Sequence, residues 1–266
     1  MPWVLRGLLN GVVTSRWPRR HDDYFDGFAS TVQVRRDVSP SEVDADVAWL
    51  CPTAAITGDR ADGLRIDQGR CILCGRCVVA APEVFEWATG ADSARLSRRG
   101  LVVGAVPETD ETLAAIREAL AQRVRALRRS VHIRHVDAGS DGSDEWEVQA
   151  LLNPVYDVHR LGIFITPSPR HADILLVTGI GAAGMTAPLR RTLEAMPTPT
   201  VVIAAGTDAV SGGLIGGGYT GGTGIDALVP VDVWVPGSPA SPFSLLHAIL
   251  LALGRVPIHP DERSRS

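Results

Sequence analysis

The chain has 266 residues, 45% of them hydrophobic, which is enough for one large domain or two small ones with a buried core. The formal net charge of −4 and the pI near 6.0 give no bulk electrostatic reason to expect nucleic acid as a partner. Four cysteines are too few for a disulfide scaffold of this length, and no uninterrupted apolar run reaches the roughly 18 residues of a membrane-spanning helix.

Residues 1–40 are interpreted as a docking lead followed by a linker. The segment 3–9 is short and amphipathic, and a basic cluster follows it from Arg16 to Arg20. The lead is too short and too soon interrupted for a signal peptide. We expect it to dock the chain peripherally, and contact with a membrane surface is the alternative, because arginine and tryptophan suit such an interface. Residues 21–40 are polar and mixed, which is typical of a linker.

Residues 41–105 contain the strongest motif of the sequence. Cys71, Cys74 and Cys77 have the spacing C-x2-C-x2-C around a glycine, so three thiols can face one [4Fe-4S] cluster. The closing cysteine of the usual ferredoxin run is absent, since an alanine stands before the expected proline. The remaining cysteine, Cys51, also precedes a proline and stands where an upstream run would end. We therefore predict a ferredoxin-like α+β domain in which the four cysteines hold one [4Fe-4S] cluster.

The positions that would serve a second cluster hold no cysteine. With the ferredoxin pattern placed to end at Cys51, these positions are Ser41, Asp44, Val47 and Ala81. One set of ligands is complete and the other is lost entirely, which argues that the remaining cluster is selected for. A structural zinc site is the alternative, but zinc sites usually pair one C-x2-C with a second close pair or with histidines. The runs 54–58 and 63–67 fit the short strands that flank ferredoxin clusters.

Residues 106–130 are predicted to form a linker helix between two domains. Thr109 is the expected N-cap, and two acidic residues follow it in the first turn. Apolar residues at a spacing of three or four continue the pattern: Leu113, Ile116, Leu120 and Val124. Four arginines load the C-terminal end: Arg123, Arg125, Arg128 and Arg129. We interpret them as compensation of the helix dipole and a solvated face, not as a nucleic-acid patch.

From residue 131 to 258 strands and helices alternate. Short β-rich runs predict strands at 131–137, 162–166, 174–178, 201–205 and 232–235. Helices are predicted at 145–152, 187–196 and 241–254. This order predicts an α/β domain with a flavodoxin-like parallel sheet and helices on both faces. Function should gather at loops beyond the carboxyl ends of the strands, at 137–144, 179–184, 206–224 and 236–241. Residues 259–266 are interpreted as a tail.

Two glycine-rich loops lie in this domain. Residues 211–224 lack the G-K-[ST] of a P-loop, and the chain has no lysine to reach phosphates. Residues 179–184 satisfy G-x-G-x-x-G between a strand and a helix, but no acidic residue ends a strand about 20 residues further on. Nucleotide binding is therefore the less favoured interpretation. We expect close backbone packing against a partner or cofactor, where side chains would not fit.

Five stretches of the C-terminal half carry a family resemblance: 136–140, 151–163, 168–179, 211–213 and 233–237. On these, residues 131–256 resemble the small-subunit family shared by complex I (its 20 kDa subunit) and the membrane-bound group 4 [NiFe]-hydrogenases, which include formate hydrogenlyase and hydrogenase-4. Residues 1–90, with the lead 11–18, resemble the two-cluster ferredoxin-type subunit of the same complexes. The chain is thus similar to a fusion of two neighbouring electron-transfer subunits.

The resemblance implies a further [4Fe-4S] cluster, held by four cysteines beside the active site of a large subunit. At the matching positions this chain has Asp141, Asp144, Asp208 and Ser238. Three carboxylates and a hydroxyl are hard ligands that suit Mg2+ or Ca2+ and not an iron–sulfur cluster. A replacement metal is one alternative, and polar residues that fill a vacated cavity are the favoured interpretation. We therefore expect no proximal cluster.

These observations predict an iron–sulfur electron-transfer subunit of a membrane-associated hydrogenase-like or complex I-like oxidoreductase, with one [4Fe-4S] cluster on Cys51, Cys71, Cys74 and Cys77 and no catalytic residue. Arg76, inside the cysteine loop, is placed to tune the cluster potential. The resemblance implies a large subunit, membrane subunits and a redox protein as partners, no nucleic acid, and a cytoplasmic position at the inner face of the cell membrane. The alternative is a structural or assembly subunit in which the cluster acts as a staple.

Overall fold

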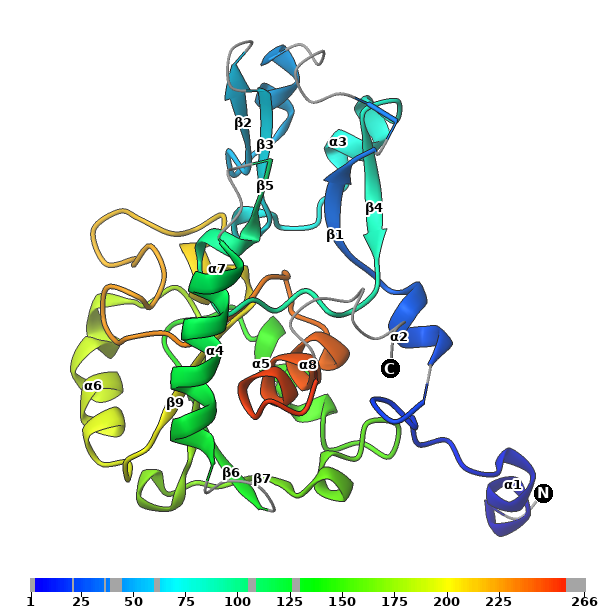
Figure 1. Cartoon of the computed structure of the whole chain (residues 1–266), viewed down its shortest axis with the longest axis vertical. Helices are drawn as coiled ribbons and strands as arrows, with labels where there is room; N and C mark the ends of the chain where they lie inside the picture. The colour runs from blue at the N-terminus through cyan, green and yellow to red at the C-terminus, as the bar shows by residue number, and fades with distance from the viewer. Residues whose placement is uncertain are drawn as a thin grey trace.

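The computed structural model describes residues 3–20, 22–35, 37–38, 45–59, 63–104, 109–125 and 130–256. Two small antiparallel sheets lie at one end of the molecule, and a larger α/β unit forms the other end (Figure 1). The predicted second-cluster positions Ser41 and Asp44, the arginines Arg128 and Arg129, and the tail 259–266 lie outside the described residues.

The larger unit is built on a five-stranded parallel sheet. Its strands are β6 (Val131–Asp137), β7 (Ile163–Ile165), β8 (Ile174–Thr178), β9 (Val201–Ala205) and β10 (Val233–Val235). They lie side by side in the order β10-β9-β8-β6-β7, and every neighbouring pair is parallel. Counted by their rank in the chain this is the order 2-1-3-4-5, which flavodoxin-like sheets have. The α/β class predicted for this half is confirmed, and each strand falls within a predicted run.

Helices cover both faces of this sheet. On one face α4 (Asp110–Val124), α5 (Ser143–Ala150) and α8 (Pro242–Ala252) share an apolar cluster with the strands. On the other face α6 (Thr186–Glu194) and α7 (Gly206–Ser211) contribute to a second cluster. Because parallel strands between two helical layers are buried on both sides, every residue of β8 and β9 is buried. Four of these helices were predicted, and α7 was not.

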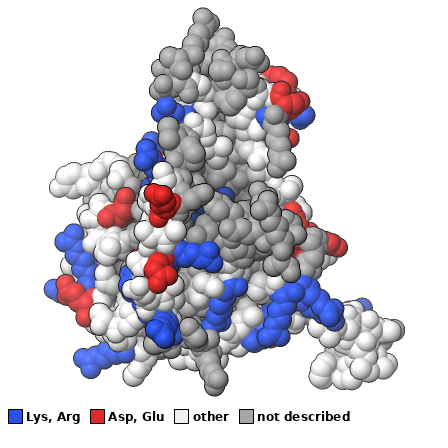
Figure 2. Space-filling model, in the orientation of Figure 1, with Lys and Arg blue, Asp and Glu red and all other residues white. Residues whose placement is uncertain are grey.

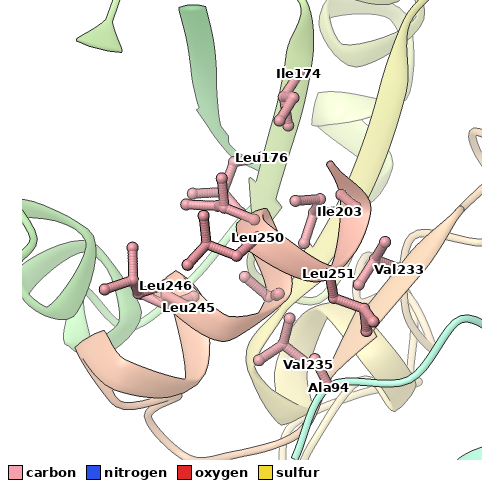
Figure 3. Close-up of a cluster of buried hydrophobic side chains, with 14 of the residues drawn as sticks. Ala94, Ile174, Leu176, Ile203, Val233, Val235, Leu245, Leu246, Leu250 and Leu251 are labelled. Atoms are coloured by element: carbon pink, nitrogen blue, oxygen red, sulfur yellow. The ribbon is translucent and has the colours of Figure 1, made fainter. Parts of the chain in front are cut away.

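The helix α8 is the centre of the first cluster. All 11 of its residues are buried, as expected for a helix that is apolar all round. Its N-terminus is closed by Ser241, whose hydroxyl oxygen accepts from the backbone N–H of Ser244 at 3.1 Å. Figure 3 shows the leucines of α8 against the sheet residues Leu176, Ile203 and Val233.

The N-terminal half contains the two small antiparallel sheets. One pairs β1 (Ala29–Val34) with β4 (Phe85–Thr89). The other contains β2 (Ile56–Asp59), β3 (Gly63–Asp67) and β5 (Val102–Val103). Strands β2 and β3 overlap the two runs predicted to flank the cysteines. A ferredoxin-like arrangement of this half remains a prediction.

Strand β1 corrects the linker predicted for residues 21–40. Its residues alternate in chemistry, and its partner β4 lies more than 50 positions further along the chain. The short helix α2 (Asp23–Gly27) precedes it and is capped by the carboxylate of Asp22. Residues 23–34 of the predicted linker are therefore folded structure, because the β-branched residues of β1 pair with a distant strand.

Shorter helical elements connect these parts. They are α1 (Trp3–Asn10), α3 (Arg76–Ala80), and the 3-10 helices η1 (Ala45–Leu50), η2 (Gln68–Arg70), η3 (Arg99–Leu101), η4 (Val158–Leu161), η5 (Pro169–His171) and η6 (Ala183–Met185). The predicted cap of α4 is confirmed, since Thr109 accepts from the backbone N–H of Thr112 at 3.2 Å. None of the described helices is long and apolar enough to cross a membrane.

The lead consists of an exposed helix, α1, and a buried tryptophan that follows it in the chain. No residue of α1 is buried, and in Figure 2 this helix stands out from the body as a mostly uncharged knob near a group of arginines. Behind it Trp17 is buried and stacks on Phe25, with the ring centroids 4.5 Å apart. Trp17 also meets Phe243 of α8 edge-on at 6.4 Å. The lead is therefore fixed to the α/β unit by aromatic packing, while α1 itself is free of the core.

The segment after β4 packs as part of the α/β unit. Ala94 and Leu96 belong to the apolar cluster of α8, and Leu101 belongs to the cluster on the opposite face. Arg95 forms two backbone hydrogen bonds with Trp234 of β10, at 2.9 and 2.8 Å. Residues before the predicted boundary at 105 and 106 thus share a core with residues after it.

Candidate cysteine site and the neighbouring carboxylates

The four cysteine side chains line one pocket. Cys51 follows η1, Cys71 follows η2, Cys74 lies in the next loop and Cys77 lies in α3. Cys74 is exposed and the other three are half-buried. The residues predicted as ligands are therefore brought together, although Cys51 stands well upstream of the motif.

The cysteine loop turns through two residues with left-handed backbone conformation. Leu73 has φ 56° and Gly75 has φ 71°, and Gly75 is also the N-cap residue of α3. A β-carbon at Gly75 would lie 3.2 Å from a ring carbon of Trp87 in β4. Both the backbone angle and this contact favour glycine at the centre of the motif.

An apolar wall surrounds the thiols. Val32 of β1, Ile56 of β2 and Ile66 of β3 line the same pocket as the cysteines. Phe85 of β4 belongs to the cluster behind them. Strands from both small sheets thus enclose the site, and solvent exposure is one of the factors that set the reduction potential of a bound cluster.

The thiols differ in how easily they lose a proton. Burial raises the pKa of Cys71 to about 11, and the neighbouring cysteines act in the same direction. Burial also raises the pKa of Cys77. Burial acts on Cys51 too, but hydrogen bonds outweigh it and its pKa is lowered. Its sulfur accepts from the backbone N–H of Ala55 at 3.2 Å and lies 3.4 Å from the hydroxyl of Thr53, so its thiolate, the form that binds metal, is stabilised.

One zinc ion and a [4Fe-4S] cluster require different spacings of the thiols. Among the residues that the structure describes, no three His, Cys, Asp or Glu side chains converge closely enough for a single metal ion. Four sulfurs bound to one zinc ion at about 2.3 Å would lie roughly 3.8 Å apart. A [4Fe-4S] cluster takes each thiolate on a different iron atom, which spreads the sulfurs more widely. The C-x2-C-x2-C spacing with one further Cys-Pro favours a cluster over a zinc ion.

The cysteine loop rests on the carboxyl ends of the parallel strands. Thr207 of α7 is fully buried, and its Oγ1 donates to the carbonyl oxygen of Cys71 at 2.9 Å. The backbone N–H of Gly237, after β10, donates to the same Oγ1 at 3.3 Å. A β-carbon at Gly69 would lie only 2.6 Å from a methyl group of Val210. The predicted cysteine site and the end of the sheet are thus in direct contact.

The four positions that match cluster ligands in the resemblance differ in exposure. Asp141 and Ser238 are exposed, Asp208 is half-buried, and Asp144 is buried. Asp141 accepts from the hydroxyl of Ser143 at 2.6 Å and from its backbone N–H at 2.9 Å, and these bonds lower its pKa. Within the described chain these carboxylates form no group that could hold an ion, so the structure gives the replacement metal no support.

Asp144 is held in a buried position at the start of α5. Its Oδ1 accepts from the backbone N–H of Ala240 at 2.9 Å. The carboxylate packs on Gly206 so closely that a β-carbon there would overlap it. The pKa of Asp144 is raised to about 7, mainly by burial and in addition by the negative charges of Asp208 and Glu145. The hydrogen bond from Ala240 acts in the opposite direction and lowers it. Burial also raises the pKa of Asp208.

A hydrogen-bonded network lies beside Asp144, and the sequence did not single it out. Glu145 accepts from the hydroxyls of Ser140, at 2.6 Å, and of Thr178. His135 Nε2 lies 3.0 Å from Oγ1 of Thr178 and 3.8 Å from Oε1 of Glu145, and burial lowers the pKa of His135. His135 and Thr178 sit near the carboxyl ends of two adjacent parallel strands, which is the signal that could have indicated them.

The G-x-G-x-x-G glycines pack against the chain itself. Gly179 and Gly181 have φ of +82° and +73°. A β-carbon at Gly179 would lie 2.6 Å from the carbonyl carbon of Gly139, and one at Gly181 would lie 2.7 Å from the carbonyl oxygen of Gly224. The close backbone approach that we predicted is present, but its partner is a neighbouring loop of the same chain.

Two known families match this chain. Residues 142–252 match the family described as NADH ubiquinone oxidoreductase, 20 Kd subunit. Residues 64–121 match the 4Fe-4S single cluster domain, a range that contains the three cysteines of the motif but not Cys51.

Two curated relatives come from hydrogen-metabolising complexes by their names. Formate hydrogenlyase subunit 7 of Escherichia coli is 39% identical over 150 residues, which are 56% of this chain and 58% of that protein. The probable membrane-bound hydrogenase subunit mbhJ of Pyrococcus furiosus is 36% identical over 141 residues, 53% of this chain and 84% of that protein. The match thus covers little more than half of the bacterial relative and most of the archaeal one.

Among solved structures, a chain of the membrane-bound sulfane sulfur reductase, an archaeal respiratory membrane complex, has a TM-score of 0.44 and 29% identity over 50% of this chain and 74% of that chain. The sequence matches decide the family, because an archaeal relative is matched over most of its length and the matched region coincides with the α/β unit. The chain belongs to the family of the 20 kDa subunit of NADH ubiquinone oxidoreductase and of the group 4 hydrogenases, and it carries a 4Fe-4S cluster domain in front of that subunit.

Proposed function

We propose that the chain is the iron–sulfur electron-transfer subunit of a membrane-associated hydrogenase-like or complex I-like oxidoreductase. It carries one [4Fe-4S] cluster on Cys51, Cys71, Cys74 and Cys77. The observation that carries this proposal is the single pocket lined by all four cysteines of the chain, one of which stands outside the matched cluster domain. The names of the hydrogenase relatives support the kind of complex.

The residues of the chain would hold and tune such a cluster. Each cysteine supplies one thiolate to one iron, and a bound cluster accepts and gives up single electrons. The apolar pocket limits water, and the N–H of Ala55 offsets negative charge on the Cys51 sulfur. Arg76, at the start of α3, lines the same pocket and adds a positive charge. Hydrogen bonds and positive charge favour the reduced state, whereas exclusion of water opposes it.

The proposal excludes a second cluster in the α/β unit. Carboxylates at Asp141, Asp144 and Asp208 and a hydroxyl at Ser238 replace the thiolates that the family resemblance calls for. Electrons therefore enter and leave through the cluster of the N-terminal half. The ferredoxin-like domain lies within residues 41–105 and the α/β domain within 131–258, with the linker helix between them, although residues 94–101 of the first part pack in the core of the second.

The partners in this proposal are other subunits of one complex. A hydrogenase-like or complex I-like large subunit docks on the loops beyond the carboxyl ends of the parallel strands, where Leu214, Ile215 and Tyr219 are exposed. Membrane subunits hold the assembly at the inner face of the cell membrane, and a redox protein exchanges electrons with the cluster.

Iron analysis and EPR test the cluster directly. The chain is purified without oxygen, and iron and acid-labile sulfide are measured before and after reduction with dithionite. We expect about four of each per chain and one reduced-cluster EPR signal. Replacement of Cys51, Cys71 or Cys77 by serine should lower the iron content, whereas Asp141→Asn should not. An iron-free protein that stays folded and supports electron transfer in its complex would overturn the proposal.

A structural role of the cluster is the second candidate. The hydrogen bond from Thr207 to Cys71 and the close contact of Gly69 with Val210 make the cysteine loop part of the packing of the α/β unit. Cys74→Ser separates the two roles, because Cys74 is the exposed cysteine. Loss of electron transfer in an intact complex favours the redox role, and loss of the complex without a redox defect favours the staple.

A further inference from the structure

Asp144 is a buried carboxyl group that has no positively charged partner in the part of the chain that the structure describes. Only 4% of the residue is exposed, and within the described residues its Oδ1 accepts one hydrogen bond, from the backbone N–H of Ala240. No donor among the described residues reaches Oδ2. The charged groups that act on Asp144 are all carboxylates: Asp208 of α7, and Glu145 and Asp141 around the start of α5. A carboxylate in this position is relieved by binding a proton.

The other elements around Asp144 bring no cation to it within the described chain. The loop before α8 contributes the N–H of Ala240, and α7 begins, directly after β9, at Gly206, which has no side chain. The ionisable groups of the neighbouring elements have other partners: His135 of β6 with Glu145, His247 of α8 with the ring of Trp17, and Arg98 beside η2 with Asp67. The negative charge of an ionised Asp144 is therefore not neutralised locally.

A short buried connection joins Asp144 to the cysteine loop. The carboxylate packs on Gly206, and the next residue, Thr207, donates from Oγ1 to the carbonyl oxygen of Cys71 at 2.9 Å. Thr207 is fully buried. The carboxyl group and the backbone of a proposed cluster ligand are thus separated by two buried residues, Gly206 and Thr207, and one hydrogen bond. In such a buried place charges act on each other more strongly than they do in water.

We propose that Asp144 is a proton-binding site coupled to the redox state of the cluster. This inference rests on the proposed function, because it needs a cluster on Cys71. When a one-electron donor reduces the cluster, the added negative charge strengthens proton binding, and a proton from solvent binds Oδ2 of Asp144. When an acceptor oxidises the cluster, the proton returns to solvent. Each electron is accompanied by a fraction of a proton, set by the change in proton affinity, and the cysteine–iron bonds are unchanged.

The size of the coupling follows from Coulomb's law. Two unit charges about 10 Å apart, at an effective dielectric constant of about 20, change each other's affinity by roughly tenfold. A tenfold change corresponds to about 59 mV for a one-electron couple. The midpoint potential of the cluster should therefore fall by about this amount as the pH rises through the titration of Asp144. At lower and at higher pH the potential should not depend on pH.

Redox titrations of the intact, cluster-loaded chain test this coupling. The potential is measured without oxygen, with dithionite and mediator dyes, from pH 5.5 to pH 9, and the cluster is followed by EPR. Wild type should show the fall, and Asp144→Asn should give a flat profile with unchanged iron content. Asp141→Asn is the matched control, since it removes an exposed carboxylate three residues earlier. It should keep the fall and move it only to slightly lower pH, because Asp141 also acts on Asp144. Asp208→Asn should move the fall to lower pH without removing it.

Infrared difference spectra give a second readout that does not depend on the folding of Asp144→Asn. Reduction of wild type near pH 7 should produce a carboxylic acid C=O band that shifts in D2O. In Asp208→Asn the pH range in which this band appears should move to lower pH. A wild-type potential that is independent of pH, with an intact cluster signal, overturns the coupling. So does a fall that persists in Asp144→Asn. A wild type without any cluster signal overturns the proposed function instead.

Discussion

Oγ1 of Thr207 donates a hydrogen bond of 2.9 Å to the carbonyl oxygen of Cys71, across 136 positions of the chain. Oγ1 of Thr207 also accepts a hydrogen bond from the backbone N–H of Gly237, at 3.3 Å. One buried hydroxyl therefore joins three segments: the cysteine loop, α7, and the loop beyond β10. The arrangement ties the iron–sulfur half to the part of the sheet where ligands of α/β proteins usually bind.

Replacement of Thr207 by valine should lower the free energy of unfolding by about 2 kcal/mol, because valine keeps the shape and removes both hydrogen bonds in a buried place. Thr207→Ser, which keeps the hydroxyl, should lose less. Urea denaturation of the two variants and wild type, without oxygen, provides the comparison. Equal stability of Thr207→Val and wild type would show that the hydroxyl does not contribute.

Gly206→Ala should be strongly destabilising. Gly206 has φ +88°, and a β-carbon would overlap the carboxylate of Asp144. The backbone strain alone costs about 1–3 kcal/mol. Gly184→Ala is the control, since nothing lies within 4 Å of its added β-carbon and its φ is not left-handed. Thermal unfolding measures the stability of both variants. If Gly206→Ala costs less stability in a protein that already carries Asp144→Ala, the clash with the carboxylate is the cause.

Asp144 should make stability fall between about pH 4 and pH 7. Burial raises its pKa from the ordinary value of 3.8 to about 7, so the folded protein holds a proton that the unfolded chain releases. The resulting stabilisation is complete below the unfolded pKa and is lost as the pH rises through the folded pKa. Its upper limit is about 4 kcal/mol, at 1.36 kcal/mol for each unit of pKa.

The asparagine variant isolates this contribution. Asp144→Asn cannot ionise, so its stability relative to wild type should rise by a few kcal/mol between pH 4 and pH 8. Asp141→Asn, whose carboxylate has a lowered pKa, should not reproduce that trend. Denaturation at several pH values gives the free energy of unfolding of each protein as a function of pH. The same pH dependence for wild type and Asp144→Asn would contradict the prediction.

Trp17→Ala should release the lead from the α/β unit. Trp17 is 2% exposed and contacts Phe25 and Phe243. The loss of a buried tryptophan typically costs 3–5 kcal/mol, roughly. We expect faster proteolysis of the first 28 residues and a lower unfolding temperature. Trp3→Ala is the matched control, because Trp3 is 84% exposed on α1 and should change neither measurement.

The parallel sheet was predictable because its strands are buried on both sides. Runs such as Ile174–Thr178 and Val201–Ala205 are continuously apolar or β-branched, and the intervening amphipathic segments have helical length. The cysteine spacing was equally informative, since it selects a cluster from local sequence alone. The proline after Cys51 indicated it as the fourth cysteine of the site, and in the fold it lines the same pocket as the other three.

The elements that were missed depend on distant partners. Helix α7 begins at a glycine and lies next to a glycine-rich loop, so its propensity is low, and it forms under burial against η2 and the sheet. Strand β1 contains polar residues, is followed by charged ones and forms by pairing with β4. The burial of Asp144 is also a long-range effect, because its local sequence is polar and its covering atoms come from Gly206 and Ala240.

The backbone pairing of Arg95 with Trp234 has a consequence for how the chain can be divided. Strand β10 is an outer strand of the parallel sheet, and Arg95 occupies hydrogen-bonding positions along its free side. Such an edge, when uncovered, is a template for another chain. A fragment that begins after residue 105 should therefore self-associate through β10. In the whole chain, the segment after β4 covers this edge and prevents other chains from pairing with it.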